Sequence, residues 1–321
     1  MTLELVIPMY NEEEALPRLL DELAKTFSPE ARAAHRIDRV SCLFVDDGSR
    51  DRSVQIVRDA ADSGLGMAIL RLSRNFGHQA AVSAGIAHST ADLVAVMDAD
   101  LQDPPACVLE MLKEWRAGYE IVNAQRRNRK EGPLKKLLYA GFYRLWSWLS
   151  PIAIQVDSGD FCLMSRRVVD ELNKLPETLR FPRGLRSWVG FSQTAIQYDR
   201  PARSAGQSSY GWRALYRLAT DGIASLSLRP LQLSQILALL YLLVSGVGIV
   251  ALLSNAFRET DIRTQLNWML VLILLGNGLI LFCVYILGSY LGRAYLEVKG
   301  RPGYVVEERV IVAEPRGSKG P

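Results

Sequence analysis

Three aspartates and a glutamine follow an apolar run in the stretch "VAVMDADLQDPP". Asp98, Asp100, Gln102 and Asp103 fall close together, and two prolines then stop the regular backbone. Carboxylate and amide oxygens, without histidine or thiol, suit a hard divalent cation such as Mg²⁺ or Mn²⁺, which usually completes its coordination with substrate phosphates. The chain has no GxxxxGK[ST] loop and no GxGxxG motif, so ATPase and dinucleotide chemistry lack their phosphate cradle. A metal-bound nucleotide diphosphate, leaving from a donor, is the chemistry that these residues indicate.

The elements that must position this stretch alternate along the first 125 residues. Short apolar runs predict strands, and segments with apolar residues at helical spacing predict helices between them. The strands are expected over residues 3–8, 40–47, 66–73, 92–100 and 119–125, and the helices over 12–27, 52–64, 77–89 and 104–118. This alternation predicts an α/β fold with a Rossmann-like, mainly parallel sheet, helices on both faces and ligands beyond the carboxyl ends of the strands.

Four of the expected strands end in polar clusters, "PMYNE", "DDGSRD", "SRNFG" and "DADLQD". Any one of these residues alone could be a helix cap or an ordinary turn. Because the carboxyl ends of parallel strands meet at one edge, four clusters in succession favour a site. That edge is expected to hold Glu12, Asp46, Asp47, Asn75, Asp98 and Asp100.

Two long stretches in the C-terminal third, residues 231–257 and 264–292, contain no Asp, Glu, Lys or Arg. Each exceeds the roughly 20 residues that a helix needs to cross a bilayer. Two buried core helices are the alternative, but a membrane hairpin explains two such stretches joined by a short polar loop better.

The N-terminus turns acidic within a few residues and does not look like a signal peptide. The basic residues on either side of the hairpin favour a cytoplasmic position for both termini. We therefore expect a multi-pass membrane protein whose two termini lie in the cytoplasm. Its parts are a cytoplasmic catalytic domain at 1–209, an amphipathic segment at 210–229, membrane helices at about 231–254 and 267–290, and a cytoplasmic tail at 293–321.

A basic segment, "RRNRKEGPLKK", runs into the aromatic segment "LLYAGFYRLWSWL". The combination suits a membrane surface with anionic headgroups, although a solvated loop before a core helix is possible. Nucleic acid is not an expected partner, because the net charge of +4 is small and no domain-wide positive charge accompanies the segment. The four cysteines are scattered and suggest neither disulfides nor a zinc site.

Six motifs in order, "VIPMYNEEEAL", "FVDDGSRDRS", "LSRNFGHQAAVSAG", "VMDADLQDPP", "DSGDFCLMSRRVVD" and "FPRGLRSWVGF", resemble those of the family-2 inverting glycosyltransferases with a GT-A fold. They are particularly similar to the polyprenyl-phosphate glycosyltransferases, which include dolichol-phosphate mannose synthase and the bactoprenol glucosyltransferases. The match runs to about residue 210, and the paired apolar stretches extend it. The resemblance implies a GT-A fold followed by two transmembrane helices.

The resemblance also implies roles for matching residues on the donor side. Asp100 and Gln102, with Asp98 nearby, would hold the Mg²⁺ or Mn²⁺ that bridges the donor diphosphate. The remaining donor contacts, to the base, the ribose or the phosphates, would come from Pro8, Tyr10, Glu12, Asp46, Asp47, Asn75, Asp98, Arg183 and Arg203. Arg180, Arg183 and Arg186 would belong to a mobile loop that closes on the donor phosphates.

On the acceptor side, Asp160 of "GDF" matches the family's carboxylate, with Asp157 beside it. Whether Asp160 acts as a base or orients the acceptor is open, since a phosphate monoester is largely ionised near neutral pH. The acceptor phosphate would be held by Arg126, Arg127, Lys135 and Lys136. Two departures from the family pattern remove expected contacts: Ser209 stands where a lysine is frequent, and Cys162 where an arginine is common.

The implied reaction moves a hexose from a nucleotide sugar to polyprenyl phosphate with inversion. A UDP-sugar and glucose are favoured, with mannose, galactose, an amino sugar or 4-amino-arabinose as alternatives. A processive polysaccharide synthase would carry a QxxRW motif, which is absent, and a catalytically silent membrane scaffold would not need the acidic edge. Homo-oligomers are possible, because glycines in the apolar stretches permit close helix packing, namely Gly246, Gly248, Gly276 and Gly278.

Overall fold

The computed structural model describes residues 1–61, 64–127, 158–178, 180–199, 229–255 and 262–314. The chain divides into two compact units. The first contains Met1–Tyr143, Ile152–Leu215 and Pro302–Pro321, and the second contains Arg144–Pro151 and Tyr216–Arg301.

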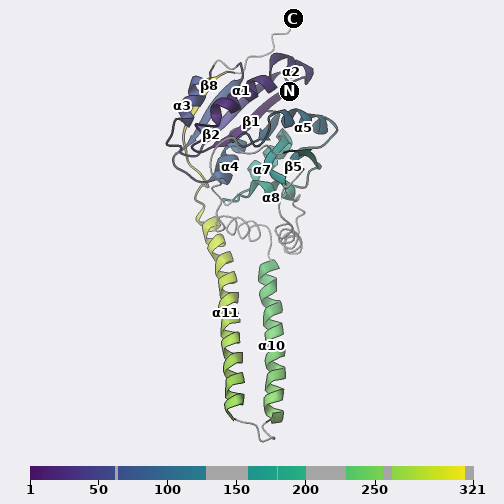
Figure 1. The fold of residues 1–321 in the computed structure, drawn as a ribbon, viewed down its shortest axis with the longest axis vertical. Helices are drawn as coiled ribbons and strands as arrows, with labels where there is room; N and C mark the ends of the chain where they lie inside the picture. Colours follow the sequence, from purple (N-terminus) through teal and green to yellow (C-terminus); the bar gives the residue numbers. More distant parts are fainter. Residues whose placement is uncertain (62–63, 128–157, 179, 200–228, 256–261, 315–321) are drawn as a thin grey trace. The chain divides into compact units, whose positions relative to one another are not determined.

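The first unit is built on an eight-stranded mixed sheet with the order β7-β5-β6-β4-β1-β2-β3-β8 (Figure 1). Its strands are β1 Thr2–Met9, β2 Arg39–Asp46, β3 Gly66–Leu72, β4 Leu93–Val96, β5 Ile121–Arg126, β6 Ser158–Ser165, β7 Gln193–Tyr198 and β8 Val306–Ala313. Its helices are α1 Leu16–Thr26, α2 Pro29–Ala34, α3 Ser53–Asp59, α4 His78–His88, α5 Ala106–Arg116, α7 Arg166–Lys174 and α8 Pro182–Trp188.

The centre of the sheet is parallel, as the strand–helix alternation predicts. Strand β1 pairs in parallel with β2 and β4, and β2 pairs in parallel with β3. All five predicted strands and all four predicted helices are present. Strand β4 ends at Val96, four residues before the predicted end, because the acidic stretch leaves the sheet to form a loop. The α/β fold class is therefore confirmed, and the loops that follow β1, β2, β3 and β4 leave from one edge.

Helices cover both faces of the sheet, each through its own apolar cluster. Leu19, Val57 and Met111, from α1, α3 and α5, belong to one cluster. Val82 of α4 and Val168 of α7 belong to the other. Burial of these apolar faces on the two sides of the parallel strands is the main stabilising contribution.

Helix α4 approaches the sheet closely at Gly85. A Cβ atom at Gly85 would lie 2.2 Å from Val6 Cγ1 and 3.0 Å from Val45 Cγ2, so only glycine fits there without a shift. This close contact sets the height of α4 above β1 and β2, and α4 is the helix that begins beside the acidic edge.

The C-terminal tail forms a strand that the sequence analysis does not predict. Strand β8 pairs antiparallel with β3 at the edge of the sheet. Its acidic side chains are paired: Glu308 lies 2.8 Å from Arg58, and Glu307 lies 3.5 Å from Arg71. Its pattern of alternating exposure is that of an edge strand with one face on the protein. The chain thus returns to the first unit after the second.

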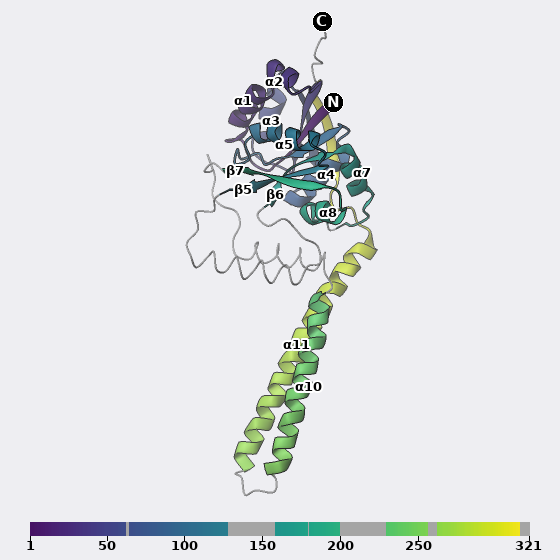
Figure 2. The ribbon, with the colours of Figure 1, turned by 90° about the vertical axis from the view of Figure 1, so that its right-hand side faces the viewer.

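The second unit contains two long helices, α10 Arg229–Asn255 and α11 Ile262–Lys299, which run side by side (Figure 2). The Tyr241 hydroxyl donates to the carbonyl of Leu272 at 2.9 Å, and its ring occupies the space above Gly276. Within the described residues one segment, Leu266–Lys299, is long and apolar enough to cross a membrane, and its most apolar 18 residues have a mean hydropathy of 2.7. In α10 the apolar stretch is shorter, Ser234–Val250. Both predicted helices form, and one of them meets the length criterion.

The glycines of these helices differ in their surroundings. Gly276 accommodates Tyr241, and a Cβ at Gly248 would lie 3.1 Å from Leu272 Cδ1, so both serve the α10–α11 contact within one chain. Among the described residues, nothing lies within 4 Å of a Cβ at Gly246 or Gly278. The expected homo-oligomer therefore stays a prediction that rests on Gly246 and Gly278.

Replacement of Gly85 by alanine should destabilise the first unit. The added methyl group overlaps Val6, and overpacking of this kind costs about 1–3 kcal/mol. Chemical denaturation of purified protein measures the change. Ala87→Ser, at an exposed position in the same helix, is the control and should change the free energy of unfolding by less than about 0.5 kcal/mol. A neutral Gly85→Ala would contradict the close approach.

Candidate active site

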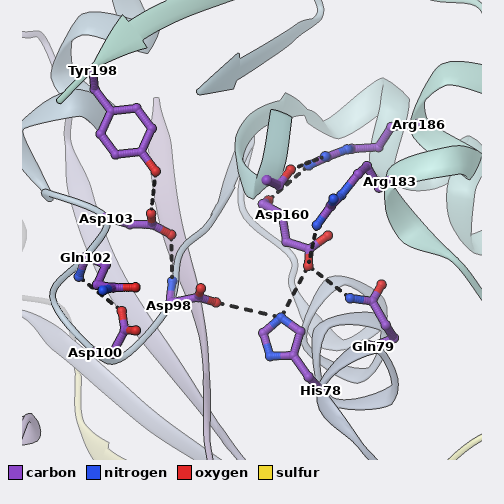
Figure 3. A network of polar contacts seen from close by, with 11 residues as sticks. His78, Gln79, Asp98, Asp100, Gln102, Asp103, Asp160, Arg183, Arg186 and Tyr198 are labelled. Atoms are coloured by element: carbon purple, nitrogen blue, oxygen red, sulfur yellow. Dashed lines mark hydrogen bonds and ion pairs between the residues drawn. The ribbon is translucent and has the colours of Figure 1, made fainter. Parts of the chain in front are cut away.

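The acidic loop after β4 is shaped by Asp103 and Tyr198. Asp103 is buried; its Oδ1 accepts a hydrogen bond from the Tyr198 hydroxyl at 2.7 Å, and its Oδ2 accepts one from the Asp98 amide at 3.3 Å. Leu101 has a φ of 60°, and the Asp100 carboxylate accepts from the Gln102 amide at 3.0 Å. These contacts form a tight turn that carries the predicted metal ligands (Figure 3).

The carboxyl end of β2 supplies two buried aspartates with different partners. Asp46 accepts from the Ser49 amide at 3.0 Å and lies 3.3 Å from Arg71 Nε. Asp47 accepts from the amides of Phe76 and Gly77 at 2.7 and 2.9 Å. Burial raises the pKa of Asp47 despite these hydrogen bonds.

Asp47 thereby fixes the point where α4 begins. Gly77, the residue before α4, has a φ of 100°, which favours glycine, and its amide donates to Asp47. The next two residues, His78 and Gln79, therefore enter the first turn of the helix in a defined orientation at the edge of the sheet.

Asp160 of β6 receives three donors on one carboxylate oxygen. Gln79 Nε2 lies 2.9 Å from Asp160 Oδ2, and His78 Nε2 and Arg183 Nη2 each lie 3.3 Å from it. Burial alone would raise the pKa of Asp160, but Arg183 and His78 hold it well below its usual range. Asp160 Oδ1 is also buried, and it has no hydrogen-bond partner in the described part of the chain.

His78 joins the acceptor-side carboxylate to the acidic loop. Its Nε2 lies 3.7 Å from Asp98 Oδ1, and the Asp98 carboxylate points toward it (Figure 3). Burial lowers the pKa of His78, but the hydrogen bond to Asp160 and the neighbouring Asp98 raise it to about 9. Burial and the nearby Asp103 raise the pKa of Asp98 to about 7. The imidazole of His78 therefore lies between two aspartates, which favour its protonated form.

Two of the three arginines in "RFPRGLR" donate hydrogen bonds to backbone carbonyls. Arg186 is 3% exposed and donates to the carbonyls of Gly159 and Asp160 at 3.0 Å each, and it also contacts Cys162 Sγ. Arg180 donates to the carbonyls of Leu175 and Glu177. The segment forms helix α8, where the sequence analysis expects a mobile loop. Arg183 alone among them pairs with a carboxylate, Asp160.

The other predicted site residues are less closely connected. Pro8 is buried in β1, Tyr10 is 44% exposed, and Asn75 is exposed. The backbone amide of Glu12 donates to Ser53 at 2.8 Å. Arg126 is half-buried at the end of β5, and Arg127 next to it is exposed. The remaining predicted residues lie outside the described residues, namely Lys135, Lys136, Asp157 and Arg203.

The acidic loop fits a divalent cation that is only partly held by protein. The described residues contain no cluster of three or more His, Cys, Asp or Glu side chains arranged for a metal. Asp98, Asp100 and Gln102 offer oxygen donors alone, from two carboxylates and an amide. Mg²⁺ is typically held by one or two carboxylates together with substrate phosphates. An incomplete oxygen set is therefore compatible with a metal that arrives with a nucleotide diphosphate.

Sequence reasoning misses several residues of this network. His78 and Gln79 open a predicted helix directly after a polar cluster, a position that could have marked them. Asp103 lies within the quoted acidic stretch but had no predicted role. Tyr198 carries no local signal, because its contact with Asp103 joins residues 95 positions apart.

Tyr198→Phe should weaken the attachment of the acidic loop while the aromatic ring keeps its apolar contacts. The variant removes the hydrogen bond to Asp103 and keeps the ring that packs edge-on against Phe161. A hydrogen bond to a charged group is worth about 1.5–3 kcal/mol, so the free energy of unfolding should fall by about this amount. Chemical denaturation measures it, with Tyr119→Phe at a more exposed position as the control. Equal stability of the two variants would contradict the role of Asp103.

Comparisons with known proteins agree with this architecture. The model of the glycosyl transferase family 2 matches residues 4–172. The chain is 40% identical to the uncharacterized glycosyltransferase YkcC of Bacillus subtilis (strain 168), covering 97% of this chain and 95% of the relative. It is 36% identical to a bactoprenol glucosyl transferase of Shigella phage SfX, covering 96% and 100%.

Among solved structures, the mannosyltransferase PcManGT from Pyrobaculum calidifontis, in complex with GDP-Man and Mn²⁺, is similar with a TM-score of 0.45. The two are 17% identical over 93% of this chain and 79% of the other, a likeness too low to carry a conclusion by itself. The family match and the relatives do carry one. The chain belongs to the glycosyl transferase family 2 and has its GT-A-like α/β fold with a mostly parallel central sheet.

Proposed function

We propose that the chain transfers a hexose, with glucose favoured, from a nucleotide-diphosphate sugar, with a UDP-sugar favoured, to polyprenyl phosphate. The observation that carries the proposal is the meeting of the acidic loop and Asp160 through His78 at one edge of the sheet. A donor site and an acceptor site thereby adjoin, as a direct transfer requires. The bactoprenol glucosyl transferase relatives, similar over nearly the whole chain, support the lipid acceptor and the sugar.

In the proposed reaction, one phosphate oxygen of the acceptor attacks the anomeric carbon of the donor sugar. The bond from that carbon to the donor diphosphate breaks, and its electron pair leaves with the diphosphate. Attack opposite the leaving group inverts the configuration. A divalent cation held by Asp98, Asp100 and Gln102 would supply neutralisation of the leaving charge. Arg183 and Arg203 would contact donor phosphates, and Arg126, Arg127, Lys135 and Lys136 the acceptor phosphate.

Asp160 is proposed to orient the acceptor rather than to deprotonate it. Three donors bind its Oδ2, and they favour its ionised form, so its affinity for a further proton is low. The attacking phosphate oxygen is already largely ionised near neutral pH and needs no base. Because an ionised phosphate has no proton to donate to Asp160, the orientation would be exerted through the basic groups that contact its Oδ2.

The pairing of β8 with β3 supports a membrane hairpin. These strands precede and follow the second unit, yet they are hydrogen-bonded neighbours, so both lie in one aqueous compartment. The number of membrane crossings between them must then be even. If α11 crosses alone, β8 and β3 would lie on opposite sides. We therefore propose that α10 and α11 cross together, with the catalytic unit and both termini at the cytoplasmic face of the bacterial inner membrane.

The proposed reaction is tested with purified full-length protein, Mg²⁺ or Mn²⁺, undecaprenyl phosphate and a panel of nucleotide sugars. Lipid-linked hexose, detected by mass spectrometry, is expected from one donor. Asp100→Ala should lower the rate by more than about 100-fold, since metal neutralisation of a leaving group is worth several kcal/mol. Asp59→Ala, an exposed aspartate in α3, is the matched control and should keep full activity. No lipid product from any donor would contradict the proposal.

The hairpin is tested by labelling single cysteines in intact spheroplasts with a membrane-impermeant maleimide. Glu259→Cys, a substitution between α10 and α11, should react with the maleimide from outside the cell. Arg301→Cys, a substitution just before β8, should react with the maleimide only after the membrane is permeabilised. Labelling of the unmodified protein gives the background of the native cysteines, of which Cys42, Cys107 and Cys162 are buried and Cys283 in α11 is half-buried. Labelling of position 259 only after permeabilisation would exclude the crossing of α10.

A further inference from the structure

We propose that His78 is a positioning residue that ties the donor side of the site to the acceptor side through one imidazole. This inference rests on the proposed function. One nitrogen, Nε2, lies 3.3 Å from Asp160 Oδ2 and 3.7 Å from Asp98 Oδ1. The shorter contact is a close ion pair, and the longer one is a weaker electrostatic attraction. No other residue drawn in Figure 3 contacts both carboxylates.

The surroundings of His78 are those of a functional group rather than of an ordinary core histidine. Its side chain is 32% exposed, and its Nε2 lies within 4 Å of two aspartates from other elements, with Arg183 on the same Asp160 oxygen. Asp98 follows β4, Asp160 lies in β6, and His78 opens α4. The histidine thus joins three separately placed segments at the point where donor and acceptor would meet.

The position of His78 is fixed by contacts of the residues directly before and after it in the chain. Asp47 holds the amides of Phe76 and Gly77, so the start of α4 is tied to the end of β2. Gln79, the next residue in α4, donates to the same Asp160 oxygen at 2.9 Å. Two adjacent residues in the first turn of α4 therefore contact the same Asp160 oxygen, which ties this turn to β6.

Two carboxylates so close to one another would otherwise repel each other. The Nε2 atom of His78 lies within 4 Å of both carboxylates, so the imidazole holds them in fixed positions relative to each other. Asp98 belongs to the proposed donor and metal side, and Asp160 to the acceptor side. Their fixed separation would set the distance between the attacking phosphate oxygen and the anomeric carbon. A misplacement of about 1 Å in such a geometry can lower the rate by about 100-fold.

The test compares kcat and KM of His78→Phe, His78→Gln and the wild type in full-length protein. His78→Phe should lower kcat by about 10- to 100-fold and leave the donor KM within about threefold, because the donor contacts remain. His78→Gln, which keeps a donor nitrogen for Asp160, should recover a large part of the lost kcat. His88→Gln, at the other end of α4, is the matched control and should match the wild type.

A double-mutant cycle with Asp160→Asn decides whether the two residues act as a unit. The double variant His78→Phe/Asp160→Asn should lose no more kcat than Asp160→Asn alone. Multiplied losses, or a loss confined to KM, would overturn the proposal. Thermal stabilisation of His78→Phe by Mn²⁺ with UDP should equal that of the wild type, and loss of this stabilisation would also overturn it.

Failure of the proposed function is separable from failure of this inference. If the wild type transfers no sugar, the proposed function fails. The same cycle is then measured by chemical denaturation, where the His78–Asp160 contact predicts non-additive changes in the denaturation midpoint. Additive changes would show that the two side chains do not interact, whatever the reaction.

Discussion

The dominant physical constraint at this sheet edge is that several aspartates gather there and each must be given a partner. Unpaired carboxylates in such a place would either repel one another or take up protons. Each carboxylate has a specific partner. Backbone amides donate to Asp47 and a hydroxyl donates to Asp103, whereas an arginine pairs with Asp46 and an imidazole lies between Asp98 and Asp160. The arrangement of these partners determines where each carboxylate points.

Because the partners come from distant parts of the chain, the site exists only when the sheet is assembled. Tyr198, which holds the acidic loop, comes from β7 at one edge of the sheet. Arg71 of β3 lies 3.3 Å from Asp46 and 3.5 Å from Glu307 of the tail. The strand that follows the long helices is thus connected to the end of β2, which belongs to the proposed donor side. Through Arg71, the C-terminal tail therefore contacts the edge of the sheet that holds the proposed site.

The sequence was sufficient for those features that depend on local pattern. Apolar periodicity located β1 to β5 and four of the helices between them, although not the short α2, and the topology of a parallel sheet then placed four polar clusters at one edge. Features that depend on contacts across the chain were not accessible in this way. Strand β8 follows a long apolar helix, and nothing in its own residues indicates pairing with β3. Tyr198 and His78 acquire their roles only from partners that lie far away in the sequence.

The same distinction between local pattern and long-range contact applies to the individual site residues. Asp100 and Gln102 stand out because their types suit a metal and their spacing places them on one turn. Arg186 shows the limit of such reasoning: it lies in a basic motif next to Arg183, yet its guanidinium is buried against backbone carbonyls of β6. Residue type cannot distinguish an arginine that meets a substrate from one that supports a strand, since both need the same planar set of donors.

The central claim is that the edge formed by the acidic loop, His78 and Asp160 binds a metal together with a nucleotide diphosphate. Anomalous scattering from Mn²⁺, in crystals of the full chain grown with UDP, tests it most directly. The account predicts a single strong peak next to the side-chain oxygens of the acidic loop, Asp100 among them, with the diphosphate density in contact with it. A Mn²⁺ peak elsewhere on the protein, or UDP bound away from this loop, would contradict the account.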